Sequence, residues 1–470
     1  IALKGGRSAS GARAASSHTG SLAGADIAAE ALFRQAGVIR TESIEEMFGV
    51  AQIFAYQPIP RGNRVCVLTN AGGPGILAAD ACEARGLEVS PLSEATQTAL
   101  REFLPPEASV ANPVDMIASA TPEHYRRAIT AVLSAPEVDS VLLIYIPPLV
   151  TRPQEVARAV REGTLEAAAD KPLIACFMMT SGAPPELRLD EKRRIPSFVF
   201  PEDAVRALAH ARDYAEYRAA PEGRIPRLGG IDTDAARQLL RSAVVDPARG
   251  GWLPTGAALR LLDLYGIPVV PTAPADSANA AAERAGELGF PVAMKVSSVA
   301  IVHKTEVGGV ALGLRSKAAV RRAFRRMKES VEALAGPRTM DGVVLQRMVP
   351  DGQEMIIGMT FDPVFGPLMM VGLGGVEVEI VRDVTFAIHP LTDLDPPRMF
   401  GGLKGARLLD EWRGRRPRDK EALGDALLRF SALVDDIPQI QEVEVNPIMV
   451  FGEGEGCMAV DARVRVGPMA

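Results

Sequence analysis

The sequence predicts an α/β protein in which a doubly wound parallel sheet is followed by a separate α+β domain. Two observations predict the first part: apolar runs of strand length alternate with helical stretches, and Gly-rich turns connect them. A third predicts the second part, because beyond about residue 231 strand-like segments gather around a polar, Gly-containing loop. A chain of 470 residues is also too long for a single core.

Residues 1–60 hold one strand-like start and two helical runs, too little for a complete sheet. We interpret them as the rear part of a first α/β domain, and we expect the natural start of the protein to lie upstream of Ile1. Residues 61–217 form the doubly wound domain, in which helices separate the strand-like runs NRVCVLTN, DSVLLIYI and PLIACFM. Residues 218–230, rich in Pro, Gly and Arg, are typical of an interdomain linker.

Residues 231–470 form the predicted α+β domain. The segments PTGAALRLLDLYG and ANAAAERAGELG are helical by pattern, and FPVAMKV, GGVALGL and GVVLQRMV are strand-like. A run of β-prone segments follows and ends in EVEVNPIMV and CMAVDARV.

Composition excludes several classes of function. The net charge of -6 is mild, and no basic tract is present, so we expect no nucleic-acid partner. Apolar residues occur in short runs, so we expect a soluble protein without a membrane span. The four cysteines lie far apart in apolar surroundings, which favours buried thiols in a reducing cytoplasm over disulfides or a metal site.

Two Gly-rich turns are candidates for binding an anion. In SSHTGSLAG, hydroxyl and glycine residues surround His18 at a predicted helix start, which suits an anion site; these residues are Ser17, Thr19 and Gly20. A histidine there can accept a phosphoryl group, although an isolated histidine is more often structural. The turn TNAGGPG joins a strand to a helix, and we predict phosphate contacts at Asn70, Gly72 and Gly73. Taken alone, this second turn is a weak signal.

The α+β domain offers candidates for a nucleotide site. Lys295 ends a strand where it can neutralise phosphates, although a lone strand lysine is more often a solvated charge. The loop after it carries His303 and ends on Gly308 and Gly309, so it can carry a histidine between two sites or simply cover a phosphate. Weaker candidates for ribose and adenine contacts are Gln346, Met348 and Glu354.

Oxygen-bearing side chains near the C-terminus predict a magnesium site. Glu444 and Asn446 alternate onto one strand face, and Asp461 joins them if the two strands pair. The alternative is that they are polar residues of an edge strand. His124, His210 and His389 have no comparable setting, and we interpret them as structural.

Together, SSHTGSLAG, TNAGGPG, KVSSVAIVHKTEVGGV and EVEVNP resemble the NDP-forming acyl-CoA synthetases, a family that includes ADP-forming acetate–CoA ligase and is related to succinyl-CoA synthetase. The resemblance covers the whole chain. It implies two flavodoxin-like ligase domains followed by an ATP-grasp domain, with a CoA-binding domain and the front of the first ligase domain missing.

The resemblance also implies roles for single residues. His18 and His303 would be phosphohistidines, with His303 on a swinging loop and Glu444 as its acidic partner. Lys295 would bind nucleotide phosphates, and Asn446 with Asp461 would hold Mg²⁺. Implied small molecules are ATP or ADP, CoA and a small carboxylic acid, and the implied assembly is a homo-oligomer. A glutamate that orients the first phosphohistidine in relatives would lie upstream of Ile1, so we expect this chain to bind Mg–ATP but to make acyl-CoA poorly by itself.

Two alternatives use some or all of these domains. A regulatory sensor module of a protein lysine acetyltransferase has no need of His18 and His303. An ATP-grasp ligase that passes acyl phosphates to amines would retain Lys295, Asn446 and Asp461 but has no use for His18. The fold alone does not separate these readings, and the two histidines favour the synthetase.

Overall fold

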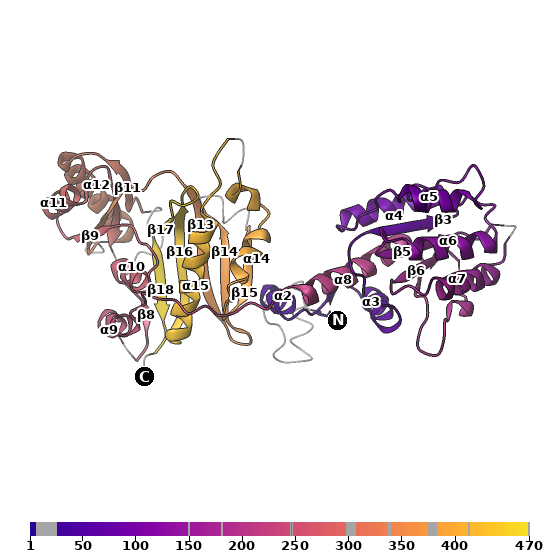
Figure 1. Cartoon of the computed structure of the whole chain (residues 1–470). Helices are drawn as coiled ribbons and strands as arrows, with labels where there is room; N and C mark the ends of the chain where they lie inside the picture. Colours follow the sequence, from indigo (N-terminus) through magenta and orange to yellow (C-terminus); the bar gives the residue numbers. More distant parts are fainter. Residues whose placement is uncertain are drawn as a thin grey trace. The chain divides into compact units, whose positions relative to one another are not determined.

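A computed structural model describes residues 1–5, 26–148, 151–179, 182–244, 246, 248–297, 307–336, 340–374, 383–411 and 414–468. By their contacts the described residues form two compact units. Unit 1 comprises residues 1–5 and 36–221, and unit 2 comprises residues 26–35 and 222–468. We describe each unit by itself (Figure 1).

Unit 1 is built on a parallel sheet of five strands within the described residues, in the order β4-β3-β5-β6-β7. This is the strand order of flavodoxin-like folds, and it confirms the doubly wound prediction. The strands are β3 (Val65–Thr69), β4 (Val114–Asp115), β5 (Ser140–Tyr145), β6 (Leu173–Phe177) and β7 (Ser197–Phe198). The central strands β3, β5 and β6 are buried along their whole length, as their continuous apolar sequences require.

Helices cover both faces of this sheet (Figure 1). One face packs against α5 (Glu94–Arg101), α6 (Pro122–Ser134) and α7 (Pro153–Ala167). The other packs against α3 (Ile44–Tyr56), α4 (Gly72–Ala84) and α8 (Pro201–Ala219). The short strands β1 (Ala2–Leu3) and β2 (Arg40–Thr41) pair in parallel, and a 3-10 turn covers Pro185–Leu187.

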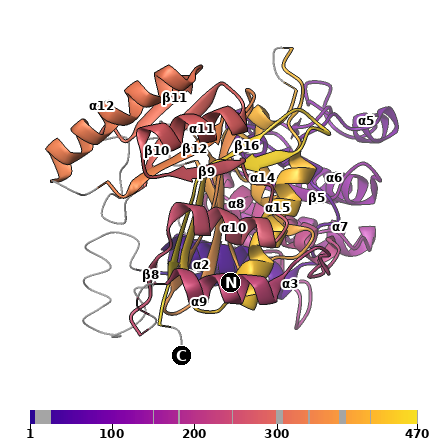
Figure 2. The same ribbon diagram turned by 90° about the vertical axis from the view of Figure 1, so that its left-hand side faces the viewer.

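Unit 2 contains two antiparallel sheets. The small sheet has the order β11-β10-β12-β9, and α11 (Ala278–Leu288) and α12 (Lys317–Ala335) lie against it (Figure 2). Its strands are β9 (Thr272–Ala275), β10 (Val292–Ser297), β11 (Val310–Leu314) and β12 (Gly342–Arg347). The side chains of Val292, Met294 and Val296 enter the core beneath those helices, so Lys295 lies on the opposite face of β10.

The large sheet of unit 2 has the order β15-β14-β13-β16-β18-β8, with β17 paired to β16. Its strands are β8 (Gly251–Trp252), β13 (Gln353–Asp362), β14 (Gly366–Leu373), β15 (Val384–Ile388), β16 (Ile440–Val450), β17 (Cys457–Ala459) and β18 (Ala462–Val466). Elements that flank it are α9 (Thr233–Ala243), α10 (Thr255–Leu264), α14 (Asp395–Gly401), the 3-10 turn Ala406–Leu409 and α15 (Lys420–Asp436). The α+β prediction for this half of the chain is confirmed.

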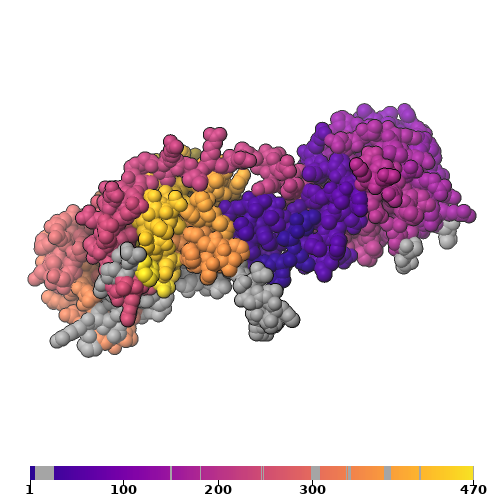
Figure 3. Space-filling view, turned by 90° about the horizontal axis from the view of Figure 1, so that it is seen from below, coloured from indigo at the N-terminus to yellow at the C-terminus, as the bar shows by residue number. Residues whose placement is uncertain are grey.

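Helix α2 (Asp26–Gln35) belongs to unit 2 by its contacts. It packs Ala28 and Ala31 against Leu368 of β14, a strand of the large sheet, whose strands and flanking helices Figure 3 shows in orange and yellow. The Gln35 amide bonds both backbone groups of Ile388, which satisfies the edge of β15.

The four cysteines are free and buried, as expected from the sequence. Among the described residues, no helix is long and apolar enough to cross a bilayer.

Candidate nucleotide and phosphoryl-transfer site

Two of the predicted nucleotide-site residues, Lys295 and Gln346, meet at one backbone carbonyl in unit 2. The Lys295 ammonium donates to the carbonyl oxygen of Val460 over 3.2 Å, and the Gln346 side-chain amide donates to the same oxygen over 2.9 Å. Lys295 also forms an ion pair with Asp461, with 3.3 Å between Nζ and Oδ2. This cluster joins β10 and β12 of the small sheet to the segment that precedes β18 of the large sheet.

The side chains of Lys295 and Gln346 are both buried, so their polar groups depend on these contacts. Lys295 is 8% exposed and Gln346 is 1% exposed. A charged or amide group so far from water needs partners inside the protein, and Val460 and Asp461 supply them. Both side chains project from the face of the small sheet opposite its core, because their neighbours Met294 and Leu345 point into that core.

The predicted metal ligands lie next to this cluster. Asn446 donates its side-chain amide to Glu444 Oε1 over 3.2 Å, and its backbone N–H donates to the Asp461 carbonyl over 3.1 Å. The pairing of β16 with β18 therefore brings Glu444, Asn446 and Asp461 together. In the described part of the chain, no group of three or more His, Cys, Asp and Glu side chains is placed to hold a metal ion.

The remaining nucleotide-site predictions concern residues with backbone partners of their own. Met348 donates its N–H to the Pro291 carbonyl, and the Glu354 carbonyl accepts from Gly374. The Gly309 carbonyl accepts from Val296, so the two glycines at 308 and 309 lead into the hairpin of β10 and β11. These are backbone contacts between described residues, and none of them involves Lys295, Gln346 or Asp461.

The Gly-rich turn of unit 1 starts α4 at the carboxyl edge of the parallel sheet, where doubly wound folds bind ligands. The Asn70 amide is committed to both backbone groups of Ile146, over 2.8 and 2.9 Å, so its side chain ties β3 to β5. No side chain caps α4. Gly72 faces a carboxylate, because a Cβ atom there would lie 3.2 Å from Asp115 Oδ2, whereas one at Gly73 would meet open space.

Sequence reasoning did not single out Asp115. It is the last residue of the two-residue strand β4 within NPVD, a stretch that carries no recognisable metal or catalytic spacing. His18, Ser17, Thr19, Gly20 and His303 lie outside the described residues, so their predicted roles stay predictions.

The other histidines have partners within the fold. His124 lies in the capping box of α6 with Thr121, His210 bonds Glu46 over 2.9 Å, and His389 bonds the Ser431 carbonyl over 3.1 Å. These contacts agree with the structural roles predicted for them.

Comparison with known proteins gives three family matches. Residues 1–54 match a succinyl-CoA ligase-like flavodoxin domain, residues 65–212 a ligase-CoA domain and residues 245–466 an ATP-grasp domain. The beta subunit of acetate–CoA ligase [ADP-forming] I from Pyrococcus furiosus is 39% identical over 207 residues, which cover 44% of this chain and 88% of that subunit. The chain belongs to the NDP-forming acyl-CoA synthetase family.

A longer member of this family aligns with nearly the whole chain. Acetate–CoA ligase [ADP-forming] I from Archaeoglobus fulgidus is 36% identical over 467 residues, which are 99% of this chain and 66% of that protein. A solved structure of the dinucleotide-forming acetyl-coenzyme A synthetase 1 from Ca. Korarchaeum cryptofilum is 38% identical, with a TM-score of 0.47, and covers 49% of this chain and 99% of its own. The comparisons lend no support to the acetyltransferase sensor alternative.

Proposed function

We propose that this chain serves ADP-forming acyl-CoA synthesis, in which a carboxylate, CoA and ATP give acyl-CoA, ADP and phosphate. The observation that carries the proposal is the convergence of two buried side chains, Lys295 and Gln346, on the half-buried segment 460–461 of the ATP-grasp unit. Membership of the synthetase family supports the same conclusion.

The proposed reaction passes one phosphoryl group along two histidines. A ring nitrogen of His303 attacks the γ-phosphorus of ATP, the bond to the β-phosphate oxygen breaks and ADP leaves. A ring nitrogen of His18 then takes the phosphoryl group, and a carboxylate oxygen of the acid takes it in turn to form an acyl phosphate. The CoA sulfur attacks the acyl carbon, loses its proton and displaces inorganic phosphate.

Among the described residues of unit 2, Lys295 is placed to bind the phosphates of the nucleotide. Its buried ammonium carries a positive charge at the junction of the two sheets, where it can offset the charge of the phosphates. We infer that the Lys295 ammonium moves from Asp461 to the phosphates when a nucleotide enters. Until then, the ion pair with Asp461 holds the ammonium at the site.

The chemistry of the donors fits magnesium. Carboxylate and amide oxygens are hard ligands, and Mg²⁺ in nucleotide sites usually takes one or two from the protein and the rest from phosphates and water. The amide nitrogen of Asn446 is directed to Glu444, and we assign its Oδ1 and the carboxylate of Asp461, which pairs with Lys295 in this structure, as the metal-binding atoms. When bound there, Mg²⁺ would neutralise charge on the phosphates.

We further infer that the protein acts on a small carboxylic acid and CoA, as a homo-oligomer in the cytoplasm. Four free, buried thiols support a reducing compartment. The match to a separate beta subunit in Pyrococcus furiosus supports assembly from several units.

The test is transfer of the γ-phosphate of labelled ATP to the protein in the presence of Mg²⁺. We expect a label that is stable to base and labile to acid, because phosphohistidine has these properties. The His303→Ala variant should lose the label. The His18→Ala variant should still accept it, because the phosphoryl group reaches His303 first.

A His124→Gln variant is the matched control, since His124 belongs to a helix cap and should leave labelling unchanged. Absence of label on a folded protein that binds Mg–ATP would contradict the proposal, and so would a label that survives in His303→Ala.

A further inference from the structure

The side chain of Gln346 is held in one orientation. Its Nε2 donates to the Val460 carbonyl, which also accepts from Lys295. A carbonyl oxygen has two lone pairs, so these two donors use its full capacity. Turning the amide over would set Oε1 against the Val460 oxygen and replace a hydrogen bond with a contact between two acceptors. The nitrogen therefore faces Val460 and the oxygen faces elsewhere.

That oxygen is an unsatisfied acceptor. Within the described residues, Gln346 Oε1 is buried and has no hydrogen-bond partner. Leaving a buried acceptor without a donor is unfavourable, so such groups usually mark a place where a ligand or an ordered water binds.

The position of this acceptor points to the nucleotide. Gln346 and Lys295 project from the same face of the small sheet, and Lys295 is ion-paired with Asp461 at the proposed metal site. An acceptor fixed beside the phosphate-binding lysine is placed to read another part of the same ligand.

We propose that Gln346 selects the base of the nucleotide, and this inference rests on the proposed function. Its Oε1 accepts a hydrogen bond from the 6-amino group of adenine. Guanine and hypoxanthine carry a carbonyl oxygen at position 6, which would face Oε1 as a second acceptor. The Val460 carbonyl prevents the amide from turning to accommodate them. The site therefore favours ATP over GTP and ITP.

The experiment measures the affinity of the full chain for Mg–ATP, Mg–ITP and Mg–GTP by calorimetry at pH 8. ITP lacks the 2-amino group of GTP, so it removes that group from the comparison. It differs from ATP at N1 as well as at position 6, and the Gln346 variants assign the effect to position 6. We expect ATP to bind roughly tenfold more tightly than ITP or more, since a mismatched buried polar group is costly.

Two variants separate base selection from a structural role. Gln346→Leu removes both donor and acceptor, so its affinities for ATP and ITP should differ by less than about threefold. Gln346→Glu keeps acceptor oxygens but at pH 8 loses the donor to Val460, so it should still prefer ATP. The test compares the ratio of the ATP affinity to the ITP affinity within each variant. A variant that binds both nucleotides equally more weakly keeps the same ratio. Gln441→Leu, an exposed position on β16, is the matched control and should keep the wild-type ratio.

Equal binding of ATP and ITP by the wild type would overturn base selection and leave the proposed function standing. Loss of the preference for ATP in both Gln346→Glu and Gln346→Leu would also overturn base selection by Oε1. It would show that the preference depends on the hydrogen bond from Gln346 to Val460. Failure of the folded wild type to bind any of the three nucleotides would overturn both proposals.

Discussion

At the scale of single residues, the ion pair between Lys295 and Asp461 couples two halves of the proposed site. The side chains are 11% and 21% exposed, so each charge depends on the other for much of its stabilisation. A phosphate that attracts Lys295 leaves Asp461 without its partner, and a divalent cation can replace that partner. Nucleotide and Mg²⁺ are thus expected to bind together.

Glu137 makes folding of unit 1 depend on pH. Burial raises the pKa of its carboxyl, but hydrogen bonds from the Ser93 backbone and from the Ser93 and Thr96 side chains outweigh burial and lower it from 4.5 to about 2. A lowered pKa means that the folded state favours the charged form. The stabilisation is therefore fully present above pH 4.5 and is lost as the pH falls towards 2.

We predict that Glu137→Gln lowers the free energy of unfolding at pH 6, and that its difference from wild type shrinks below pH 4.5. Urea titrations followed by circular dichroism at pH 6, 4.5 and 3 would measure this. Glu107→Gln, at an exposed position, is the control. A difference that stays constant across this range would mean that the charge of Glu137 contributes nothing to folding.

The candidate residues of the site were easier to predict than the contacts among them. Lys295, Asn446 and Asp461 follow from residue type, spacing and resemblance, and the pairing of β16 with β18 brings the last two together. Their convergence on Val460 could not be predicted, because a backbone carbonyl carries no sequence signal. Similarly, the commitment of Asn70 to Ile146 depends on which strands are neighbours in the sheet, and a single turn does not reveal that.

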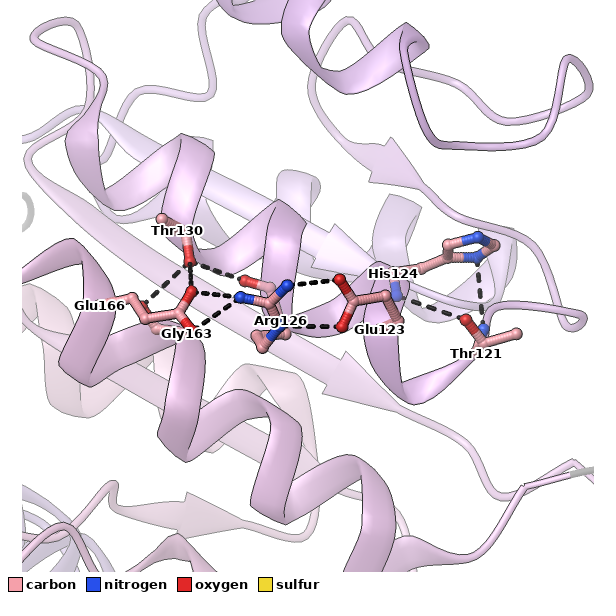
Figure 4. Close-up of polar contacts among 7 residues, drawn as sticks. All are labelled: Thr121, Glu123, His124, Arg126, Thr130, Gly163 and Glu166. Carbon is pink, nitrogen blue, oxygen red and sulfur yellow. Dashed lines mark hydrogen bonds and ion pairs between the residues drawn. The ribbon is translucent and has the colours of Figure 1, made fainter.

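At the scale of elements, α6 and α7 pack closely because a glycine lies at their contact. A Cβ atom at Gly163 would lie 2.4 Å from the backbone oxygen of Arg126. Polar contacts surround this point: the Arg126 guanidinium bonds both Glu123 and Glu166, and Thr130 donates to the carbonyls of Arg126 and Gly163 (Figure 4).

We predict that Gly163→Ala destabilises unit 1 by about 1–3 kcal/mol, because the backbone of α6 must move to admit a methyl group. Thermal and urea unfolding would measure the change. The matched control is Gly256→Ala in α10, where a Cβ atom meets open space and alanine should be neutral or stabilising. Equal stability of Gly163→Ala and wild type would show that the helices can separate at no cost.

Long, strongly patterned elements were the most predictable. Strands β3, β5 and β6 and helices α10 and α11 lie within a few residues of their predicted places. Helix α15 was missed, although Leu423, Leu427 and Phe430 recur at helical spacing and are buried, because we interpreted that region as β-prone. The packing of α2 on β15 joins residues far apart in sequence, so local pattern could not predict it.

At the scale of the whole molecule, the proposed steps are divided between the units. The cluster of Lys295, Gln346 and Asp461 lies in unit 2, whereas the Gly-rich turn that starts α4 lies in unit 1. Each unit has its own cores, so each can respond separately to a ligand.

We predict that Mg–ATP protects unit 2 from amide hydrogen exchange and leaves unit 1 unchanged. At a nucleotide concentration of about 100 times the dissociation constant, binding stabilises the folded state by about 2.7 kcal/mol, which slows exchange through unfolding of unit 2 about 100-fold. Protection should appear in β10, β12 and β18, but not in β3, β5 or β6.

The Lys295→Met variant, which removes the ammonium but keeps the length of the side chain, should lose most of this protection. Removing Mg²⁺ with EDTA should weaken it in the wild type, because Asp461 then lacks the cation that binds together with the nucleotide. Protection confined to unit 1, or equal in Lys295→Met and wild type, would place the nucleotide away from the Lys295 cluster.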